Sequence, residues 1–203
     1  MKLILASSSP RRSELLSQIG VQFNVQSADI DESPLPGEQA SKYVVRMAQE
    51  KVLACLSLQQ GDQGFVIVGA DTSVIVDGDI LGKPTDYYEA KGMLLRLSGR
   101  EHQVMTSVCV ATCNNGIATN NPDITTRLVT TDVCFRSLSE SQIQAYWSSG
   151  EPQDKAGAYG IQGFGAVFVE SIKGSYSAVV GLPLAETAEL LSAAGVQIWQ
   201  KKY

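Results

Sequence analysis

The chain has 203 residues, of which 44% are hydrophobic and 18% are charged, so it is long enough to bury a core and is typical of globular protein. Its net charge of −5 argues against a surface built to coat nucleic acid, and a phosphate ligand would require a local cluster of cations. The sequence has no apolar run of membrane-spanning length and no basic-then-apolar leader, which predicts a soluble, cytoplasmic protein with no membrane partner. The length predicts one large domain, or two lobes that share a cleft.

The N-terminal stretch predicts a strand, a loop and a helix that together bind an anion. Residues 3–6 are an apolar run suited to a buried strand, and the serines at 7–9 followed by Pro10 suit the cap and first turn of a helix. A helix N-terminus carries unpaired N–H groups and the positive end of the helix dipole. Arg11 and Arg12 are unfavourable in such a turn, so we expect a bound polyanion to compensate them. The alternative is a solvated arginine pair on a surface helix.

Three segments with different patterns follow. Residues 21–25 alternate as a half-buried strand does, residues 30–38 combine acids, prolines and a glycine as an exposed loop does, and residues 43–56 form an amphipathic helix. Lys51 lies beside the apolar stripe of this helix. On pattern alone, a surface ion pair along the helix and a functional cation are equally open for Lys51.

The apolar run 65–69 predicts a strand buried on both faces, which we expect to emerge at Asp71 before an extended segment and a hairpin turn at 77–78. A carboxylate is costly to bury unless it is paired or functional. Ligands of open α/β sheets gather at the carboxyl ends of strands. Asp71 is therefore a candidate functional acid, with a cap or turn acid as the structural alternative.

The short turn around Lys83 superficially resembles a phosphate-binding P-loop. Its spacing is too short, and Pro84 stands where that motif has a hydroxyl residue, so we reject a Walker motif. Gly82 and Pro84 nevertheless hold the backbone of Lys83 in a defined turn, which keeps Lys83 as a candidate cation.

The rest of the chain alternates predicted helices and strands. We expect a helix at 86–97 capped by Asp86, strands at 103–112 and 128–136 joined by a turn at 114–116, a helix at 139–147 with a capping box, a hairpin of 166–172 and 176–180, and a helix at 184–194. Residues 151–165 are rich in glycine, which favours close approach of the backbone to a ligand over a flexible linker. The order of these glycines excludes a dinucleotide-binding fingerprint.

Cysteine and histidine offer little for catalysis. The four cysteines form no C-x-x-C pair and are expected to be buried free thiols, and His102 is the only histidine. The unusual positions are cations, carboxylates and one amide: Arg11, Arg12, Lys51, Lys83, Lys155, Glu32, Asp71, Asp154 and Gln162. Cations that neutralise phosphate oxygens, with carboxylates that hold Mg²⁺ or Mn²⁺, suit cleavage of a phosphoanhydride.

Five blocks of the sequence resemble, in order, the signature blocks of the Maf family of nucleoside triphosphate pyrophosphatases, first known as septum-formation inhibitors. Each block alone would be weak, but the combination is specific and covers nearly the whole chain. The Tyr-Gly-Ile-Gln-Gly sequence is most similar to the dTTP/UTP pyrophosphatase subgroup. The blocks are residues 6–12 (ASSSPRR), 69–72 (GADT), 81–84 (LGKP), 154–163 (DKAGAYGIQG) and 174–183 (GSYSAVVGLP).

The resemblance implies an α/β fold with a long, mixed, twisted sheet flanked by helices and two lobes around a cleft, similar to inosine triphosphate pyrophosphatases, in one domain over residues 1–203. It implies hydrolysis between the α and β phosphates with a divalent cation, and a homodimer. By resemblance, Asp71 is the proton acceptor, and Arg11, Thr72 and Gln162 are specificity positions. The positions around the phosphates and metal are Ser9, Arg12, Glu32, Lys51, Lys83 and Asp154, with Lys155 beside them.

Our hypothesis is that Arg12, Lys51 and Lys83 grip the triphosphate and that Asp71 activates or orients the attacking water. Glu32 and Asp71 would hold the metal, with Asp31 as the alternative to Glu32. The amide of Gln162 offers a donor and an acceptor that match the imide edge of uracil or thymine. Two other functions remain open: a Maf enzyme that prefers 7-methylated GTP, and a regulator of cell division that binds nucleotide without hydrolysing it.

Overall fold

The structure is a computed structural model that describes residues 1–27, 29–59, 64–113 and 122–200. The chain divides into two compact units. The first comprises Met1–Asp71, Thr106–Leu128 and Gly181–Tyr203, and the second comprises Thr72–Met105 and Val129–Val180. Three long strands contribute residues to both units: β3 (Phe65–Val76), β5 (Glu101–Cys113) and β6 (Asp123–Phe135).

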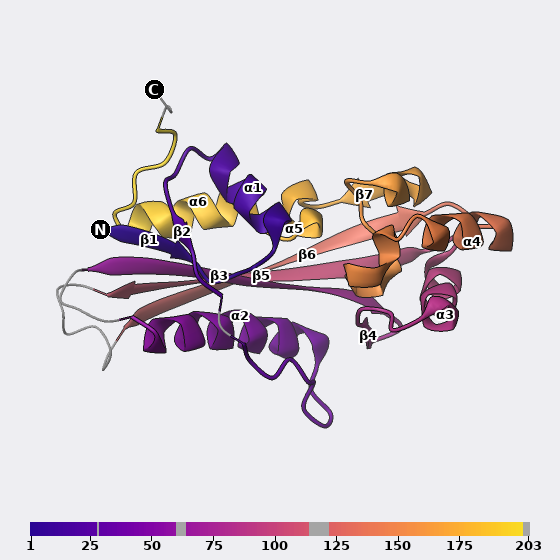
Figure 1. The fold of residues 1–203 in the computed structure, drawn as a ribbon, viewed down its shortest axis with the longest axis horizontal. Helices are drawn as coiled ribbons and strands as arrows, with labels where there is room; N and C mark the ends of the chain where they lie inside the picture. Colours follow the sequence, from indigo (N-terminus) through magenta and orange to yellow (C-terminus); the bar gives the residue numbers. More distant parts are fainter. Residues whose placement is uncertain (28, 60–63, 114–121, 201–203) are drawn as a thin grey trace. The chain divides into compact units, whose positions relative to one another are not determined.

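Across the described residues, seven strands form one mixed sheet in the order β2-β1-β3-β5-β6-β7, with β4 paired to β3. β1 (Lys2–Leu5) pairs in parallel with both β2 (Asn24–Val25) and β3. β4 (Asp79–Leu81) pairs antiparallel with β3, and β7 (Val169–Lys173) pairs antiparallel with β6. The predicted α/β class, a mixed sheet flanked by helices, is confirmed (Figure 1).

In the first unit, helices connect the parallel strands. α1 (Pro10–Gln18) links β1 to β2, and α2 (Ala40–Ser57) links β2 to β3. Figure 1 shows α2 on one side of the sheet and both α1 and α6 (Leu184–Ala193) on the other. Both faces of β1 and of the first half of β3 are thus covered, which explains the continuously apolar runs at residues 3–5 and 65–68, whereas both residues of β2 are exposed. The core on the α2 side is formed mainly by Ile4, Ala6, Ala48, Val52, Cys55, Phe65, Ile67, Cys109 and Ala111.

Gly69 allows α2 to lie close against β3. A Cβ atom at this position would stand 2.6 Å from Val52 Cγ2 and 3.0 Å from the Ala48 carbonyl oxygen, both on α2. Any side chain would therefore push the helix away from the strand. The glycine of the GADT block thus sets the distance between a helix and the buried strand that carries Asp71.

In the second unit, α3 (Tyr87–Leu97) and α4 (Glu140–Ser148) enclose a separate core. Their N-termini are capped as predicted: the Asp86 side chain accepts from the Glu89 amide, and Ser139 and Gln142 form a reciprocal capping box. The hairpin turn before β4 is also confirmed. The core includes Leu94, Leu97, Val133, Phe135, Ile143, Tyr146, Tyr159 and Phe168.

The predicted hairpin of residues 166–172 and 176–180 is wrong. Its first half is a 3₁₀ turn, η3 (Phe164–Phe168), followed by β7, and its second half is a short helix, α5 (Tyr176–Val180). The Ser175 hydroxyl accepts from the Ala178 amide at 3.2 Å, which caps a helical turn. Residues 176–180 (YSAVV) are apolar apart from one serine, a pattern that suits either secondary structure, and the Ser175 cap favours the helix.

The end of β3 and the cap of α1 differ from the predictions. β3 does not emerge at Asp71 but continues to Val76, so that Asp71 lies inside the strand. Ser9 is at the N-cap of α1 with Pro10 next, as predicted, but its side chain makes no capping hydrogen bond. Instead Ser7 Oγ accepts from the Ser9 amide at 3.2 Å. The turn predicted at 114–116 lies outside the described residues.

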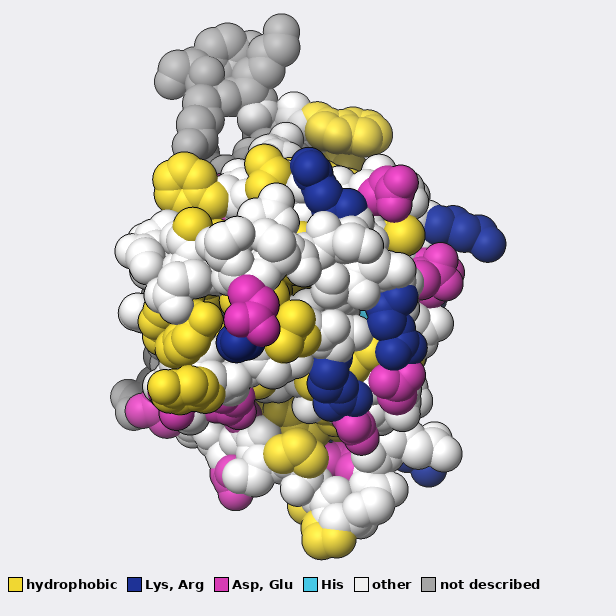
Figure 2. Space-filling view, turned by 90° about the vertical axis from the view of Figure 1, so that its right-hand side faces the viewer, with side chains coloured by type: hydrophobic (Ala, Val, Ile, Leu, Met, Phe, Trp, Pro, Cys, Tyr) yellow, Lys and Arg dark blue, Asp and Glu magenta, His cyan; other side chains and the backbone are white. Residues whose placement is uncertain are grey.

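Among the described residues, no helix is both long and apolar enough to cross a membrane. On the face drawn in Figure 2, Lys and Arg side chains are interspersed with Asp and Glu side chains. That face is therefore not a basic patch of the kind that binds nucleic acid, in line with the net charge of −5.

Candidate active site

Lys51 places its ammonium group between two carboxylates in the first unit. Its Nζ lies 2.7 Å from Asp71 Oδ1 and 2.7 Å from Glu32 Oε1. These side chains come from α2, from the interior of β3 and from the loop that precedes α2. Lys51 is therefore a cation shared by two acids from other elements, and its functional role stays a prediction.

Asp71 is buried and depends on this partner. Only 8% of the residue is exposed, and a buried carboxylate without a partner is costly. Asp71 and Gly69 share one face of β3 because side chains two residues apart in a strand point the same way. The close approach of α2 at Gly69 brings Lys51, the residue before Val52, to the Asp71 carboxylate.

Arg12 joins the same charged group from the first turn of α1. Its Nε donates to the Gly181 carbonyl oxygen at 2.9 Å, and its Nη1 donates to Ser7 Oγ at 3.3 Å. Burial lowers the pKa of Arg12, whereas the negative charges of Asp71 and Glu32 act to raise it. Because a guanidinium does not lose its proton in proteins, Arg12 remains a fixed positive charge beside the two acids.

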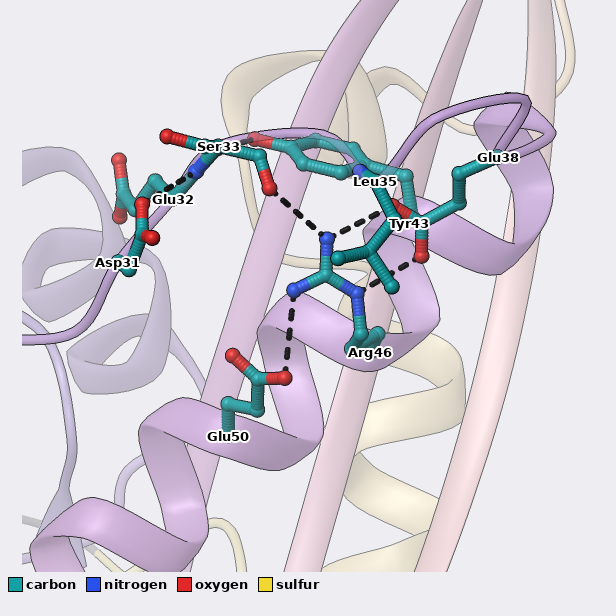
Figure 3. Close-up of polar contacts among 8 residues, drawn as sticks. All are labelled: Asp31, Glu32, Ser33, Leu35, Glu38, Tyr43, Arg46 and Glu50. Atoms are coloured by element: carbon teal, nitrogen blue, oxygen red, sulfur yellow. Dashed lines mark hydrogen bonds and ion pairs between the residues drawn. The ribbon is translucent and has the colours of Figure 1, made fainter.

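The loop that carries Glu32 is tied to α2. Tyr43 Oη donates to the Glu32 carbonyl oxygen at 2.8 Å, while Lys51 binds the Glu32 carboxylate. Burial, followed by the charges of Asp71 and Glu32, raises the pKa of Tyr43 to about 12, so its hydroxyl keeps the proton that it donates. The alternative acid, Asp31, accepts instead from the Ser33 amide at 2.9 Å (Figure 3).

The remaining predicted site residues have these positions. Ser9 and Arg11 lie at the start of α1 in the first unit, and both are partly exposed. Thr72, the residue after Asp71, is the first residue of the second unit. The other four also belong to the second unit: Lys83 and Gln162 are exposed, and the Lys155 ammonium pairs with Asp154 Oδ1 at 2.6 Å.

The glycine-rich segment closes around a carboxylate of the protein itself. Glu151 accepts from the Phe164 amide at 2.8 Å, from the Gly165 amide at 3.0 Å and from the Tyr146 hydroxyl at 2.8 Å. A Cβ atom at Gly163 would collide with the Glu151 carboxylate. At these positions the backbone approaches Glu151, which the sequence patterns did not identify, and its approach to a ligand stays a prediction.

His102 is a buried core residue. Its Nε2 lies 2.9 Å from Tyr159 Oη, and its ring packs edge-on against Phe135 and Tyr159. Burial lowers the pKa of His102 to about 4, so the ring is neutral at neutral pH. The cysteines are free thiols as predicted, of which Cys55, Cys109 and Cys113 are buried.

The carboxylates of Glu32 and Asp71 fit a divalent cation only if other ligands complete its coordination. Among the described residues, no group of three or more His, Cys, Asp and Glu side chains is arranged to hold a metal. Glu32 and Asp71 do converge on one positive charge, the Lys51 ammonium. Magnesium is commonly bound by one or two carboxylates together with water and substrate phosphates. The two acids therefore fit a cation that arrives with a phosphate ligand.

Comparisons with known proteins agree with the sequence motifs. A family model described as a Maf-like protein matches residues 2–194, and the chain belongs to the Maf family. The dTTP/UTP pyrophosphatase of Hahella chejuensis is 52% identical over 198 residues, which cover 98% of this chain and 94% of the relative. The dTTP/UTP pyrophosphatase of Pseudoalteromonas atlantica is 52% identical over 191 residues, which cover 94% of this chain and 95% of the relative.

Among solved structures, a HAM1 protein from Coxiella burnetii aligns with a TM-score of 0.40 and 15% sequence identity. The alignment covers 95% of this chain and 99% of that chain.

Proposed function

We propose that this chain hydrolyses dTTP and UTP to the nucleoside monophosphate and pyrophosphate. Relatives with 52% identity over nearly the whole chain carry the name dTTP/UTP pyrophosphatase. The structural observation that carries the proposal is the charged group in the first unit, where Lys51 and Arg12 stand beside the buried acid Asp71. Positioned cations beside a carboxylate suit phosphoanhydride cleavage, in which catalysis depends largely on neutralising phosphate oxygens.

Fixed cations would bind the triphosphate. Arg12 is held by the Gly181 carbonyl and the Ser7 hydroxyl, and Lys51 by two acids, so neither side chain has to be ordered when the substrate arrives. We assign Ser9 to the same role in the first unit. In the second unit we assign Lys83, Asp154 and Lys155 to substrate binding, and we propose that residues 1–203 act as one Maf domain.

Asp71 would accept the proton of the attacking water. The water oxygen bonds to phosphorus, the anhydride bond between the α and β phosphates breaks, and the water proton passes to the Asp71 carboxylate. Lys51 fixes the orientation of that carboxylate through its 2.7 Å hydrogen bond to Oδ1. A positioned general base is typically worth about 10²–10⁴ in rate.

A divalent cation, Mg²⁺ or Mn²⁺, would be held by Glu32 and Asp71 together with substrate phosphates. When bound, such a cation supplies positive charge to the phosphate oxygens and orients them. The second acid in this assignment is Glu32 rather than Asp31, because Glu32 is the one whose carboxylate shares Lys51 with Asp71.

Selection of the base is assigned to Arg11, Thr72 and Gln162. The Gln162 side chain is exposed in the glycine-rich segment, where its amide can donate to and accept from the imide edge of a pyrimidine. A purine presents a different shape and hydrogen-bonding pattern, which the Gln162 amide would match less well.

Release of pyrophosphate from a panel of triphosphates tests the proposal. We expect turnover of dTTP and UTP with Mg²⁺ or Mn²⁺ to exceed turnover of dGTP, dATP and 7-methyl-GTP. Preference for 7-methyl-GTP would assign the chain to another activity of its family, and nucleotide binding without any pyrophosphate release would indicate a regulator. Light scattering tests the homodimer that the resemblance implies, and cell fractionation tests the cytoplasmic location that suits a substrate from the nucleotide pool.

A further inference from the structure

The loop that presents Glu32 has little apolar anchoring. Residues 31–37 are exposed, and Leu35, the largest apolar side chain of the loop, is 56% exposed. An exposed segment without buried side chains loses conformational entropy on ordering and needs polar contacts to hold it in place. The contacts that fix this loop therefore decide where the Glu32 carboxylate stands.

Arg46, on α2, uses all three guanidinium nitrogens to hold the loop and its own helix (Figure 3). Its Nε and Nη2 donate to the two carboxylate oxygens of Glu38, each at 2.7 Å, and Nη2 also donates to the Ser33 carbonyl oxygen at 3.0 Å. Its Nη1 donates to Glu50 Oε1 at 3.2 Å, one turn further along α2. Two of these three hydrogen-bonding partners, Glu38 and Ser33, thus belong to the loop.

Glu38, which binds Arg46, also forms hydrogen bonds within the turn at the end of the loop. Its Oε2 accepts from the Leu35 amide at 3.0 Å, and its own amide donates to the Leu35 carbonyl oxygen at 3.0 Å. The Glu38 side chain is only 8% exposed and that of Arg46 only 22% exposed, so the bidentate pair is shielded from water. Shielded bidentate pairs are stronger than ordinary surface ion pairs.

The chain of contacts runs from Arg46 to Asp71. Arg46 binds the carbonyl of Ser33, the residue after Glu32, and Lys51 then binds both the Glu32 carboxylate and Asp71. We propose that Arg46, acting with Glu38, is a positioning residue that fixes the loop so that the Glu32 carboxylate stands at Lys51 and Asp71. This inference rests on the proposed function, in which Glu32 and Asp71 serve one reaction.

The geometry requires arginine rather than any cation. A lysine at position 46 would keep the charge, but its single ammonium could not bind both Glu38 oxygens in parallel and reach the Ser33 carbonyl as well. Loss of a residue that orients a metal-binding side chain typically costs about 10–100-fold in metal affinity or activity. We therefore expect Arg46→Lys to resemble Arg46→Ala.

A double-mutant cycle tests the inference on the full-length protein. Arg46→Ala and Arg46→Lys remove the guanidinium on the helix, and Glu38→Gln removes the carboxylate on the loop. Glu50→Gln is the matched control, because Glu50 is an acidic partner of Arg46 that lies on α2 and not in the loop. Each of these substitutions, and Glu32→Gln, is made singly in the wild-type chain, and Arg46→Ala is also combined with Glu32→Gln. The measurements are kcat/KM for dTTP, the Mn²⁺ concentration for half-maximal rate, and exchange of the Leu35 amide hydrogen.

We expect Arg46→Ala and Arg46→Lys to lower kcat/KM about 10–100-fold, to raise the Mn²⁺ requirement and to speed exchange of the Leu35 amide. Glu38→Gln changes the same quantities in the same direction, and Glu50→Gln leaves all three near wild type. In the Glu32→Gln background, Arg46→Ala has little further effect, because the residue that it positions has lost its carboxylate.

The outcomes separate this inference from the proposed function. If Glu32→Gln is impaired while Arg46→Ala and Glu38→Gln retain wild-type kcat/KM, the positioning role is wrong and the activity stands. Equal losses from Arg46→Ala in the wild-type and Glu32→Gln backgrounds also contradict it, because they show a merely structural effect. If Glu32→Gln itself turns over dTTP normally, the assignment of Glu32 in the proposed function fails.

Discussion

The Lys51 ammonium lies 2.7 Å from Asp71 Oδ1, in a pair whose side chains are only 14% and 11% exposed. This ion pair joins α2 to the interior of β3. It depends on Gly69, two residues before Asp71, because the absence of a side chain there lets α2 lie close to β3. Removing one member of a buried pair leaves the other charged group without its hydrogen-bonded partner, here with Arg12 as the remaining cation beside Asp71. Stability and chemistry are therefore linked at Lys51.

Lys51→Met removes the cation and leaves the Asp71 carboxylate buried. We expect the free energy of unfolding in urea to fall by about 3 kcal/mol and turnover of dTTP to be lost. The double variant Lys51→Met with Asp71→Asn no longer buries a charge, so it should regain most of the stability without any turnover. Unchanged urea midpoints in the single variant would show that the pair contributes nothing to folding.

Gly69→Ala tests the close approach of α2 to β3. A Cβ atom there would meet Val52 and the Ala48 carbonyl, so we expect a loss of about 1–3 kcal/mol from overpacking and a lower kcat as Lys51 shifts. Gly92→Ala is the matched control, because Gly92 lies in α3 with open space around its Cα. In a helix interior, replacing glycine by alanine should raise the free energy of unfolding by at most about 1 kcal/mol. Equal effects of the two substitutions would refute the steric explanation.

Gln162→Ala tests the selection of the base. Loss of a donor and acceptor on the pyrimidine edge should reduce the preference for dTTP over dGTP about tenfold, the size of one well-placed hydrogen bond. The measurement is the ratio of kcat/KM for the two nucleotides. An unaltered ratio would remove Gln162 from base recognition.

His102 makes folding sensitive to mild acid. Its pKa is lowered to about 4 from the ordinary 6.5, so between these values the unfolded chain binds a proton that the folded chain does not. Stability should therefore fall as the pH drops from about 6.5 to about 4, by up to about 1.4 kcal/mol per pH unit from this group. His102→Asn should show a flatter dependence in urea unfolding at several pH values. Parallel curves for the two proteins would exclude His102 as the cause.

Much of the fold could be predicted because periodicity and capping agree locally. β1 and the first half of β3 contain continuous apolar runs, α2 has a clear apolar stripe, and Asp86 and Ser139 mark helix starts. The prediction failed at residues 176–180, where a short, largely apolar segment fits strand and helix equally well. It also misplaced the end of β3, because Asp71 is a charged residue that stays within a buried strand.

The candidate site was only partly predictable for a different reason. Arg12, Lys51 and Asp71 are unusual for their local environments, so the sequence singles them out. Tyr43, Arg46 and Glu151 look ordinary in sequence, because their roles come from hydrogen bonds to loops whose course no periodicity encodes. Only the acids at both ends of the loop 31–38 hint that a cation binds it.

Asp71→Asn tests the central claim most directly, since it removes the proton acceptor while keeping the size of the side chain. Nucleotide affinity is measured by equilibrium binding of dTTP, and turnover by pyrophosphate release at saturating dTTP and Mn²⁺. The account predicts a dTTP dissociation constant within a few-fold of wild type and a kcat reduced about 10²–10⁴-fold. A variant that binds dTTP and still releases pyrophosphate at the wild-type rate would contradict it.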